Sequence, residues 1–126
     1  NLCKRGICDS LQPHPINWIA FTAMIKTIKR NQFQRPVTQA KVQKLWKIRG
    51  FSCHLYIDGP GQEWNDFVHQ TNELVTVIDG QLRLTVGKEA IVLNVGDEFF
   101  IAAELCHSVK NISDSETHWL FGYHGT

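Results

Sequence analysis

The sequence has few cysteines, no long hydrophobic run and no repeated or low-complexity tract. Its four cysteines, at positions 3, 8, 53 and 106, are too few and too irregularly spaced for a disulfide framework in a chain of 126 residues. Cys3 and Cys8 also lack the second cysteine or histidine pair that a zinc ribbon requires. We therefore expect reduced thiols, and with them a cytoplasmic protein.

The longest apolar stretch, residues 16–25, is interrupted by Asn17 and Thr22. It is about half as long as a membrane-spanning helix needs to be. Lys4 and Arg5 precede it, but no small-residue cleavage site follows, so the stretch does not read as a secretory signal. We expect a buried helix here and no contact with a membrane.

Acidic residues are scarce in the first part of the chain and basic residues in the rest. Residues 1–50 hold ten of the 13 basic side chains and one of the 12 acidic ones. This imbalance predicts a basic segment that lies against an acidic barrel, of its own chain or of a partner subunit. The basic residues are spaced out rather than massed, so nucleic-acid binding is the less favoured interpretation.

The first 40 residues are predicted to form a basic, partly helical extension, and residues 41–126 a separate barrel. Residues 16–30 contain no glycine or proline and are apolar around most of a helical circumference, which favours a helix. Residues 31–36 are interpreted as a break. The pattern of residues 37–48 fits either a helix or a strand, and we favour a strand near Leu45.

After Gly50 the hydrophobic period changes to two, which is typical of strands. Asp79-Gly80 lies between two strand-like runs, 73–78 and 81–86, and is a dipeptide that two-residue hairpin turns prefer. Several short strands at this spacing predict an all-β barrel or sandwich. The other expected strands are residues 51–57, 90–93, 98–101, 107–111 and 117–123.

Two long spaced patterns occur in order between residues 61 and 111. The first comprises Gly61, Phe67, His69, Glu73 and Gly80, and the second comprises Gly96, Ala102, Glu104, His107 and Asn111. In type and spacing they resemble the two motifs of the cupin superfamily, and the chain is similar to its small single-domain members of mostly unassigned function. Three positions differ from the motifs: phenylalanine replaces the first histidine, Ala102 a proline and Glu104 a glycine.

The resemblance implies an antiparallel double-stranded β-helix, or jelly-roll barrel, with His69, Glu73 and His107 pointing into it. From the residues alone, His69 ends one strand-like run and Glu73 begins the next, so their side chains can converge. Two imidazoles and one carboxylate are a ligand set associated with non-haem Fe(II), which Zn, Mn or Ni also accept. We therefore predict one divalent metal ion at these three residues.

Phe67 and Trp64 are the predicted wall of the pocket beside this metal. Phe67 removes one ligand of the family's motif and makes the pocket drier. His54 could replace the missing ligand if it faced inward, but the alternation of Cys53, Leu55 and Ile57 favours those three for the core face.

Three functions are consistent with these features. The first is a metal-dependent enzyme acting on a small organic acid or phenol, with the dioxygenase chemistry that the resemblance implies, or isomerase or lyase chemistry. The second is a non-catalytic cupin that binds or senses a small molecule. The third is a structural metal that ties strands together. A homodimer is expected, because the apolar residues 16–25 would be costly to expose on a monomer.

Overall fold

The structure is a computed structural model that describes residues 28–125. The helix predicted at residues 16–30 lies mostly outside this range, and where it can be compared it is wrong. Residues 28 and 29 are instead a short strand, β1 (Ile28–Lys29), that pairs with β7 (Glu98–Ile101).

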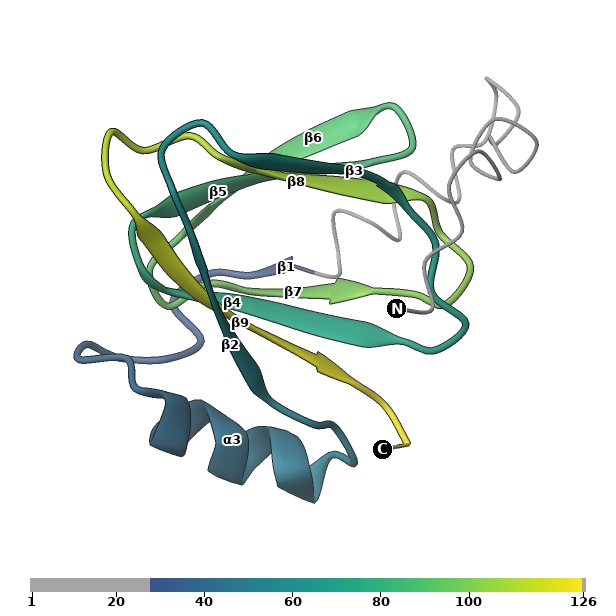
Figure 1. The fold of residues 1–126 in the computed structure, drawn as a ribbon. Helices are drawn as coiled ribbons and strands as arrows, with labels where there is room; N and C mark the ends of the chain where they lie inside the picture. Colours follow the sequence, from purple (N-terminus) through teal and green to yellow (C-terminus); the bar gives the residue numbers. More distant parts are fainter. Residues whose placement is uncertain (1–27, 126) are drawn as a thin grey trace.

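Two antiparallel sheets face each other, as Figure 1 shows, which confirms the predicted all-β jelly-roll architecture. One has the strand order β1-β7-β4-β9-β2, and the other β3-β8-β5-β6. The remaining strands are β2 (His54–Asp58), β3 (Glu63–Phe67), β4 (Glu73–Asp79), β5 (Gln81–Val86), β6 (Glu89–Asn94), β8 (His107–Asn111) and β9 (Thr117–Tyr123).

The turn at Asp79-Gly80 is not the predicted hairpin. β4 and β5 have the predicted positions, but they lie in different sheets and do not pair with each other. Gly80 adopts a φ of +102°, and a Cβ atom there would lie 2.9 Å from Cα of Thr117. The glycine is thus needed for a tight passage from one sheet to the other. The adjacent hairpin is β5–β6, which closes at Val86 and Glu89.

The strand favoured near Leu45 is also wrong, because this segment forms the helix α3 (Gln39–Ile48). The Thr38 side chain caps its first turn by accepting a hydrogen bond from the Lys41 amide. Gly50, with a φ of +85°, ends it in a Schellman arrangement, in which the Phe51 amide donates to the Trp46 carbonyl.

Two hydrophobic clusters hold the layers together. One fills the space between the sheets, and the other packs α3 and the chain before it against the outer face of the five-stranded sheet. The first contains Val75, Val77, Leu82, Leu84, Val86, Leu93, Phe99, Ile101, Val109 and Trp119. The second contains Phe33, Val37, Val42, Trp46, Cys53, Leu74 and Leu120.

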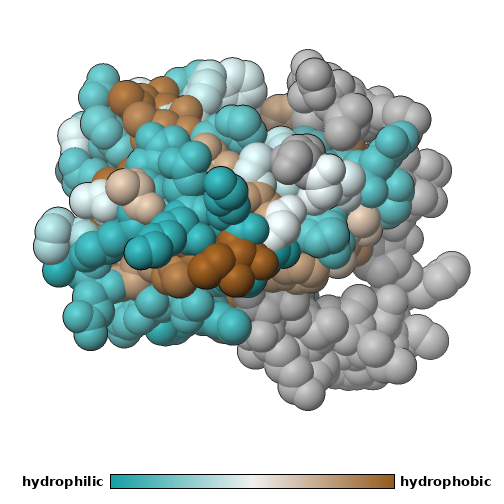
Figure 2. All heavy atoms as spheres, turned by 90° about the horizontal axis from the view of Figure 1, so that it is seen from below, coloured by the Kyte–Doolittle hydropathy of each residue, from teal (hydrophilic) through white to brown (hydrophobic). Residues whose placement is uncertain are grey.

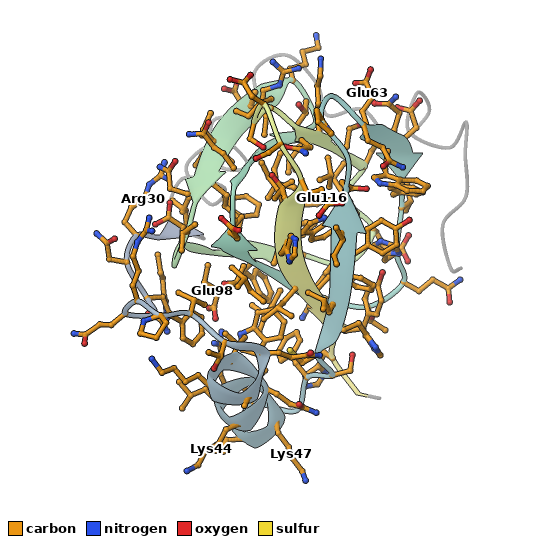
Figure 3. The ribbon with its side chains drawn as sticks, turned by 60° about the vertical axis from the view of Figure 1, so that its left-hand side comes forward. Arg30, Lys44, Lys47, Glu63, Glu98 and Glu116 are labelled. Atoms are coloured by element: carbon orange, nitrogen blue, oxygen red, sulfur yellow. The ribbon has the colours of Figure 1, made fainter. Side chains whose placement is uncertain are left out.

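Two arginines of the basic segment form ion pairs with acidic residues at the start of β7. Arg30 lies 2.6 Å from Asp97, and Arg49 lies 2.9 Å from the buried Glu98, which also accepts a hydrogen bond from the Trp46 indole. Figure 3 shows Glu98 facing the helix. The expected contact between basic segment and acidic barrel therefore exists within one chain at these two points.

The other side of α3 is exposed to solvent. Lys44 and Lys47 project away from the sheet in Figure 3. The surface on this side is mainly hydrophilic, with a few separate hydrophobic areas (Figure 2). Leu45 and Ile48 are exposed large hydrophobic side chains of the helix. No helix among residues 28–125 is long and apolar enough to cross a membrane.

The expectation of reduced thiols is wrong for Cys106, which is disulfide-bonded. Cys53 is a buried free thiol. The cytoplasmic location stays a prediction, and it loses the support that reduced thiols would have given it.

Candidate metal centre and adjoining cavity

His69, Glu73 and His107 converge at one end of the barrel. Glu73 is the first residue of β4, in the five-stranded sheet, and His107 is the first residue of β8, in the opposite sheet. His69 lies in the loop that joins β3 to β4. One candidate ligand atom from each of the three lies within 4.8 Å of the others, and all three side chains are buried.

The distances within this triad suit a metal ion better than direct hydrogen bonding. Oε1 of Glu73 lies 3.3 Å from Nε2 of His69 and 3.3 Å from Nε2 of His107. The same oxygen is buried and has no hydrogen-bond partner. Two ligand atoms bound to one ion at about 2.1 Å are themselves about 3.0–3.5 Å apart. A buried carboxylate oxygen that two imidazole nitrogens approach at this spacing fits a shared divalent cation.

Backbone contacts hold the imidazole of His107 and the loop that carries His69. Nδ1 of His107 lies 3.0 Å from the Leu105 carbonyl, so Nδ1 carries the proton and donates it, and the lone pair of Nε2 faces Glu73. The loop that carries His69 is fixed by the Glu104 amide, which donates to the His69 carbonyl at 2.8 Å.

The imidazole of His69 is kept neutral by its surroundings. Burial lowers its pKa below the ordinary value of 6.5, and His107 acts in the same direction while the charge of Glu73 opposes both. A neutral imidazole has a lone pair to offer a metal ion. The hydroxyl of Tyr123 lies 3.4 Å from Nε2 of His69.

A cavity of about 330 Å³ adjoins the triad. Trp64 and Phe67, the predicted wall residues, both line it. The ring of Phe67 stacks on that of His69, with their centroids 6.2 Å apart. The other lining residues are Tyr56, His69, Glu73, His107, Val109, Trp119, Phe121 and Tyr123. The cavity is thus largely aromatic, with its one carboxylate at the triad.

The assignment of faces on β2 is the main error of the sequence interpretation at this site. Cys53 is buried as expected, but Leu55 and Ile57, also expected in the core, are 43% and 45% exposed, whereas Tyr56, itself 37% exposed, lines the cavity. His54 shares the face of Tyr56, because it pairs with Phe121, but it is exposed and lies outside the triad. The register explains this, because Tyr56 pairs with Trp119 of β9, and the alternation of Trp119, Phe121 and Tyr123 marks the cavity face.

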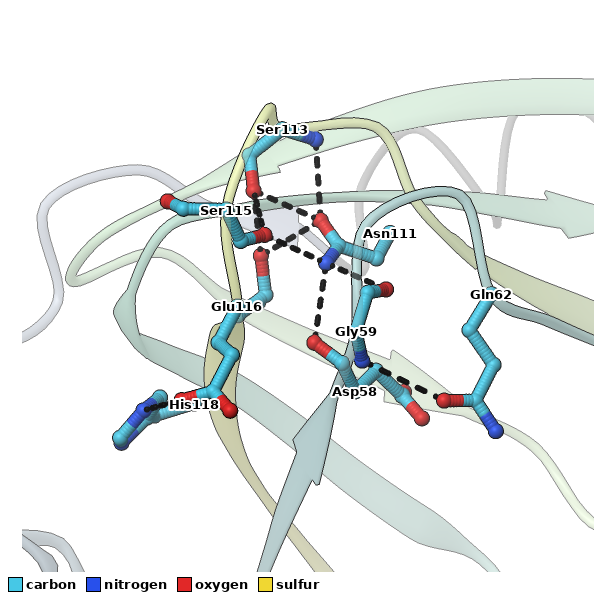
Figure 4. A network of polar contacts seen from close by, with 9 residues as sticks. Asp58, Gly59, Gln62, Asn111, Ser113, Ser115, Glu116 and His118 are labelled. Atoms are coloured by element: carbon cyan, nitrogen blue, oxygen red, sulfur yellow. Dashed lines mark hydrogen bonds and ion pairs between the residues drawn. The ribbon is translucent and has the colours of Figure 1, made fainter.

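The last residue of the second motif, Asn111, braces the far end of the cavity. Nδ2 of its buried side chain lies 2.8–3.0 Å from the carbonyl oxygens of Asp58, Gly59 and Ser115 (Figure 4), and its oxygen accepts from Thr117 at 2.7 Å. These contacts join the ends of β8, β2 and β9. Asn111 is therefore a structural residue that holds the chain around Asp58.

Comparison with known proteins agrees with this fold. The family model "Cupin domain" (Cupin_2) matches residues 54–123, more than half of the chain, so the chain belongs to this family. No curated protein sequence matches the chain significantly.

Solved structures with the same fold are distant in sequence. A cupin 2 domain-containing protein from Halorhodospira halophila has a TM-score of 0.56 at 18% identity, over 61% of this chain and 54% of that one. An oxalate oxidase in complex with the substrate analogue glycolate has a TM-score of 0.55 at 21% identity, over 60% and 42%. The chain thus spans about half the length of these two proteins.

The cupin domain of an XRE family transcriptional regulator from Enterobacter cloacae is covered more fully. Its TM-score is 0.55 at 24% identity, over 62% of this chain and 84% of that one. Identities this low establish a shared fold and nothing further.

Proposed function

We propose that this cupin domain binds one divalent metal ion through His69, Glu73 and His107, and acts as a metal-dependent enzyme on a small organic molecule held in the adjoining cavity. The observation that carries the proposal is the buried Oε1 of Glu73, which has no hydrogen-bond partner and lies 3.3 Å from both Nε2 atoms. Iron, manganese, zinc and nickel all accept such a ligand set.

Three protein ligands leave coordination positions open to a small molecule. The bound ion would supply Lewis-acid chemistry, and oxygenase chemistry if it is redox-active. The chain itself contributes a dry site, because Phe67 covers the two histidines. The hydroxyl of Tyr123 is placed beside His69 to donate a hydrogen bond to an oxygen of the bound molecule.

Oxygenase chemistry is the preferred reaction class, with isomerase and lyase activity as the alternatives. The test is oxygen consumption by the iron(II)-loaded protein with a panel of small organic acids and phenols, with the zinc-loaded protein as the redox-inert control. Oxygen uptake that depends on both iron and one panel member supports the oxygenase. A metal-loaded protein that binds panel members and converts none contradicts the enzyme.

A non-catalytic sensor is the second candidate. It is favoured by the similarity to the cupin domain of a transcriptional regulator, the similar structure that this chain covers most fully among the three described above. In that case the same panel gives saturable binding without turnover. The two functions are therefore separated by product analysis on one set of samples.

A further inference from the structure

Asp58 connects the two tryptophans of the cavity wall, which come from opposite sheets. Its side chain is fully buried at the end of β2. Oδ1 accepts a hydrogen bond from the indole N–H of Trp64 on β3, and Oδ2 accepts one from Trp119 on β9, both at 2.9 Å. Because both indole N–H groups are used in this way, the two side chains offer only aromatic carbon to the cavity.

Further rings continue this aromatic wall. Tyr56 packs edge-to-face against Trp64 and Trp119, at centroid distances of 5.6 and 6.0 Å. Six of the ten lining residues are aromatic: Tyr56, Trp64, Phe67, Trp119, Phe121 and Tyr123. Ring faces and edges in this arrangement attract another aromatic ring beyond simple burial of apolar area.

The charge of the cavity is equally restricted. Within residues 28–125, no lysine or arginine lines it, and Glu73 is its one carboxylate. A divalent ion together with that carboxylate would carry a net charge of about +1 in a site of low dielectric. One anionic group on the ligand neutralises this charge, whereas a second would be buried without a partner.

We propose that the cavity binds a small aromatic monoanion, an aryl carboxylate or a phenolate, with its anionic oxygen at the triad and its ring against the tryptophans. Asp58 is the positioning residue that holds both indoles in this orientation. The anionic half of this inference rests on the proposed metal site. A cavity of about 330 Å³ is at the small end of the usual range for ligand sites, which suits a single ring.

The test is calorimetric titration of the zinc-loaded protein with benzoate, cyclohexanecarboxylate and oxalate. Benzoate is expected to bind about tenfold more tightly than cyclohexanecarboxylate, which has the same charge but no aromatic ring. It is also expected to bind more tightly than oxalate, which carries a second charge. Equal binding of the two cyclic acids, or tighter binding of oxalate, overturns the proposal.

The role of Asp58 is tested with Asp58→Asn, whose amide cannot accept from both indoles as the carboxylate does. The ratio of the affinity for benzoate to that for cyclohexanecarboxylate should fall towards one. The tryptophan emission should shift, and the zinc content should stay unchanged. Asp79→Asn, at an exposed position, is the matched control. An unchanged preference overturns the positioning role. If Asp58→Asn does not fold, Trp64→Leu, at a half-buried position, must lower the preference instead.

The zinc content of each sample separates this inference from the proposed function. If the wild-type protein takes up no zinc, the metal site and the anionic half of the inference both fail. The aromatic half is then decided on the metal-free protein by comparing phenol with cyclohexanol. A preference for phenol upholds it, and equal binding overturns it.

Discussion

Glu73 and His107 belong to opposite sheets, yet Oε1 of the first lies 3.3 Å from Nε2 of the second, and no hydrogen bond joins them. Such an arrangement leaves a buried polar atom unsatisfied, which costs stability unless a cation occupies the space between the groups. A metal ion held between the two groups, as proposed above, would account for this contact.

Glu73→Gln tests that interpretation. An amide N–H can donate to an imidazole nitrogen where a carboxylate cannot, so the metal-free variant should be as stable as the wild type or more stable, by up to about 2 kcal/mol. Its metal affinity should fall. Urea denaturation with and without chelator measures the first effect, and metal titration the second.

Glu98→Gln is the matched control, since Glu98 is equally buried but accepts hydrogen bonds from Trp46 and Arg49. It should be destabilised by about 1–3 kcal/mol, with metal binding unchanged. If the two variants lose the same stability, the account of Glu73 as an unsatisfied ligand is wrong.

Phe67 occupies the position of a histidine in the family's first motif, and its ring lies 6.2 Å from that of His107. Phe67→His should therefore add a fourth protein ligand and tighten metal binding by about tenfold or more, equivalent to about 1.4 kcal/mol. Competition with a chromophoric chelator measures the affinity. Phe67→Leu serves as the control without a ligand atom, and equal affinities in the two variants would show that a side chain at position 67 does not reach the metal.

Gly80→Ala should destabilise the protein by about 2–4 kcal/mol, because a methyl group collides with Thr117 and φ is positive. Gly61 also has a positive φ, of +76°, but has open space around it. Gly61→Ala should therefore cost only about 1 kcal/mol. Equal losses in denaturant titrations would mean that the passage between the sheets is looser than described.

Burial raises the pKa of the Cys53 thiol to about 11, from an ordinary value of 9.0. A group whose pKa is higher in the folded state contributes its full stability below the unfolded pKa and loses it as the pH rises towards the folded one. Between about pH 9 and 11 the wild type should thus lose about 1–2 kcal/mol more than Cys53→Ala. If the free energies of unfolding of the two proteins changed equally with pH, burial would not raise the pKa of this thiol.

The sequence interpretation succeeded where local pattern and structure share the same cause. The strands β7, β8 and β9 have the predicted bounds, since each is a short run bounded by turn residues. The spaced motifs named the three residues that the fold brings together, although they are far apart along the chain.

The sequence interpretation failed where pairing between distant segments determines the structure. Asp79-Gly80 is a good hairpin dipeptide, but β4 pairs with β7 and β9, so the turn joins two sheets. Similarly, the sequence pattern placed Leu55 and Ile57 on the core face, because the pairing of Tyr56 with Trp119 cannot be read from the sequence. Segment 39–48 buries only Val42 and Trp46, a signal too sparse to distinguish a helix from a strand.

The most direct test of the metal centre is elemental analysis of the protein purified without chelator, alongside His69→Ala, His107→Ala and His54→Ala. The account predicts near-stoichiometric divalent metal in the wild type and in His54→Ala, whose histidine is exposed outside the triad, and its loss in the other two variants. A folded wild type that holds no metal, and takes up none of iron, manganese, nickel or zinc when offered, would contradict it.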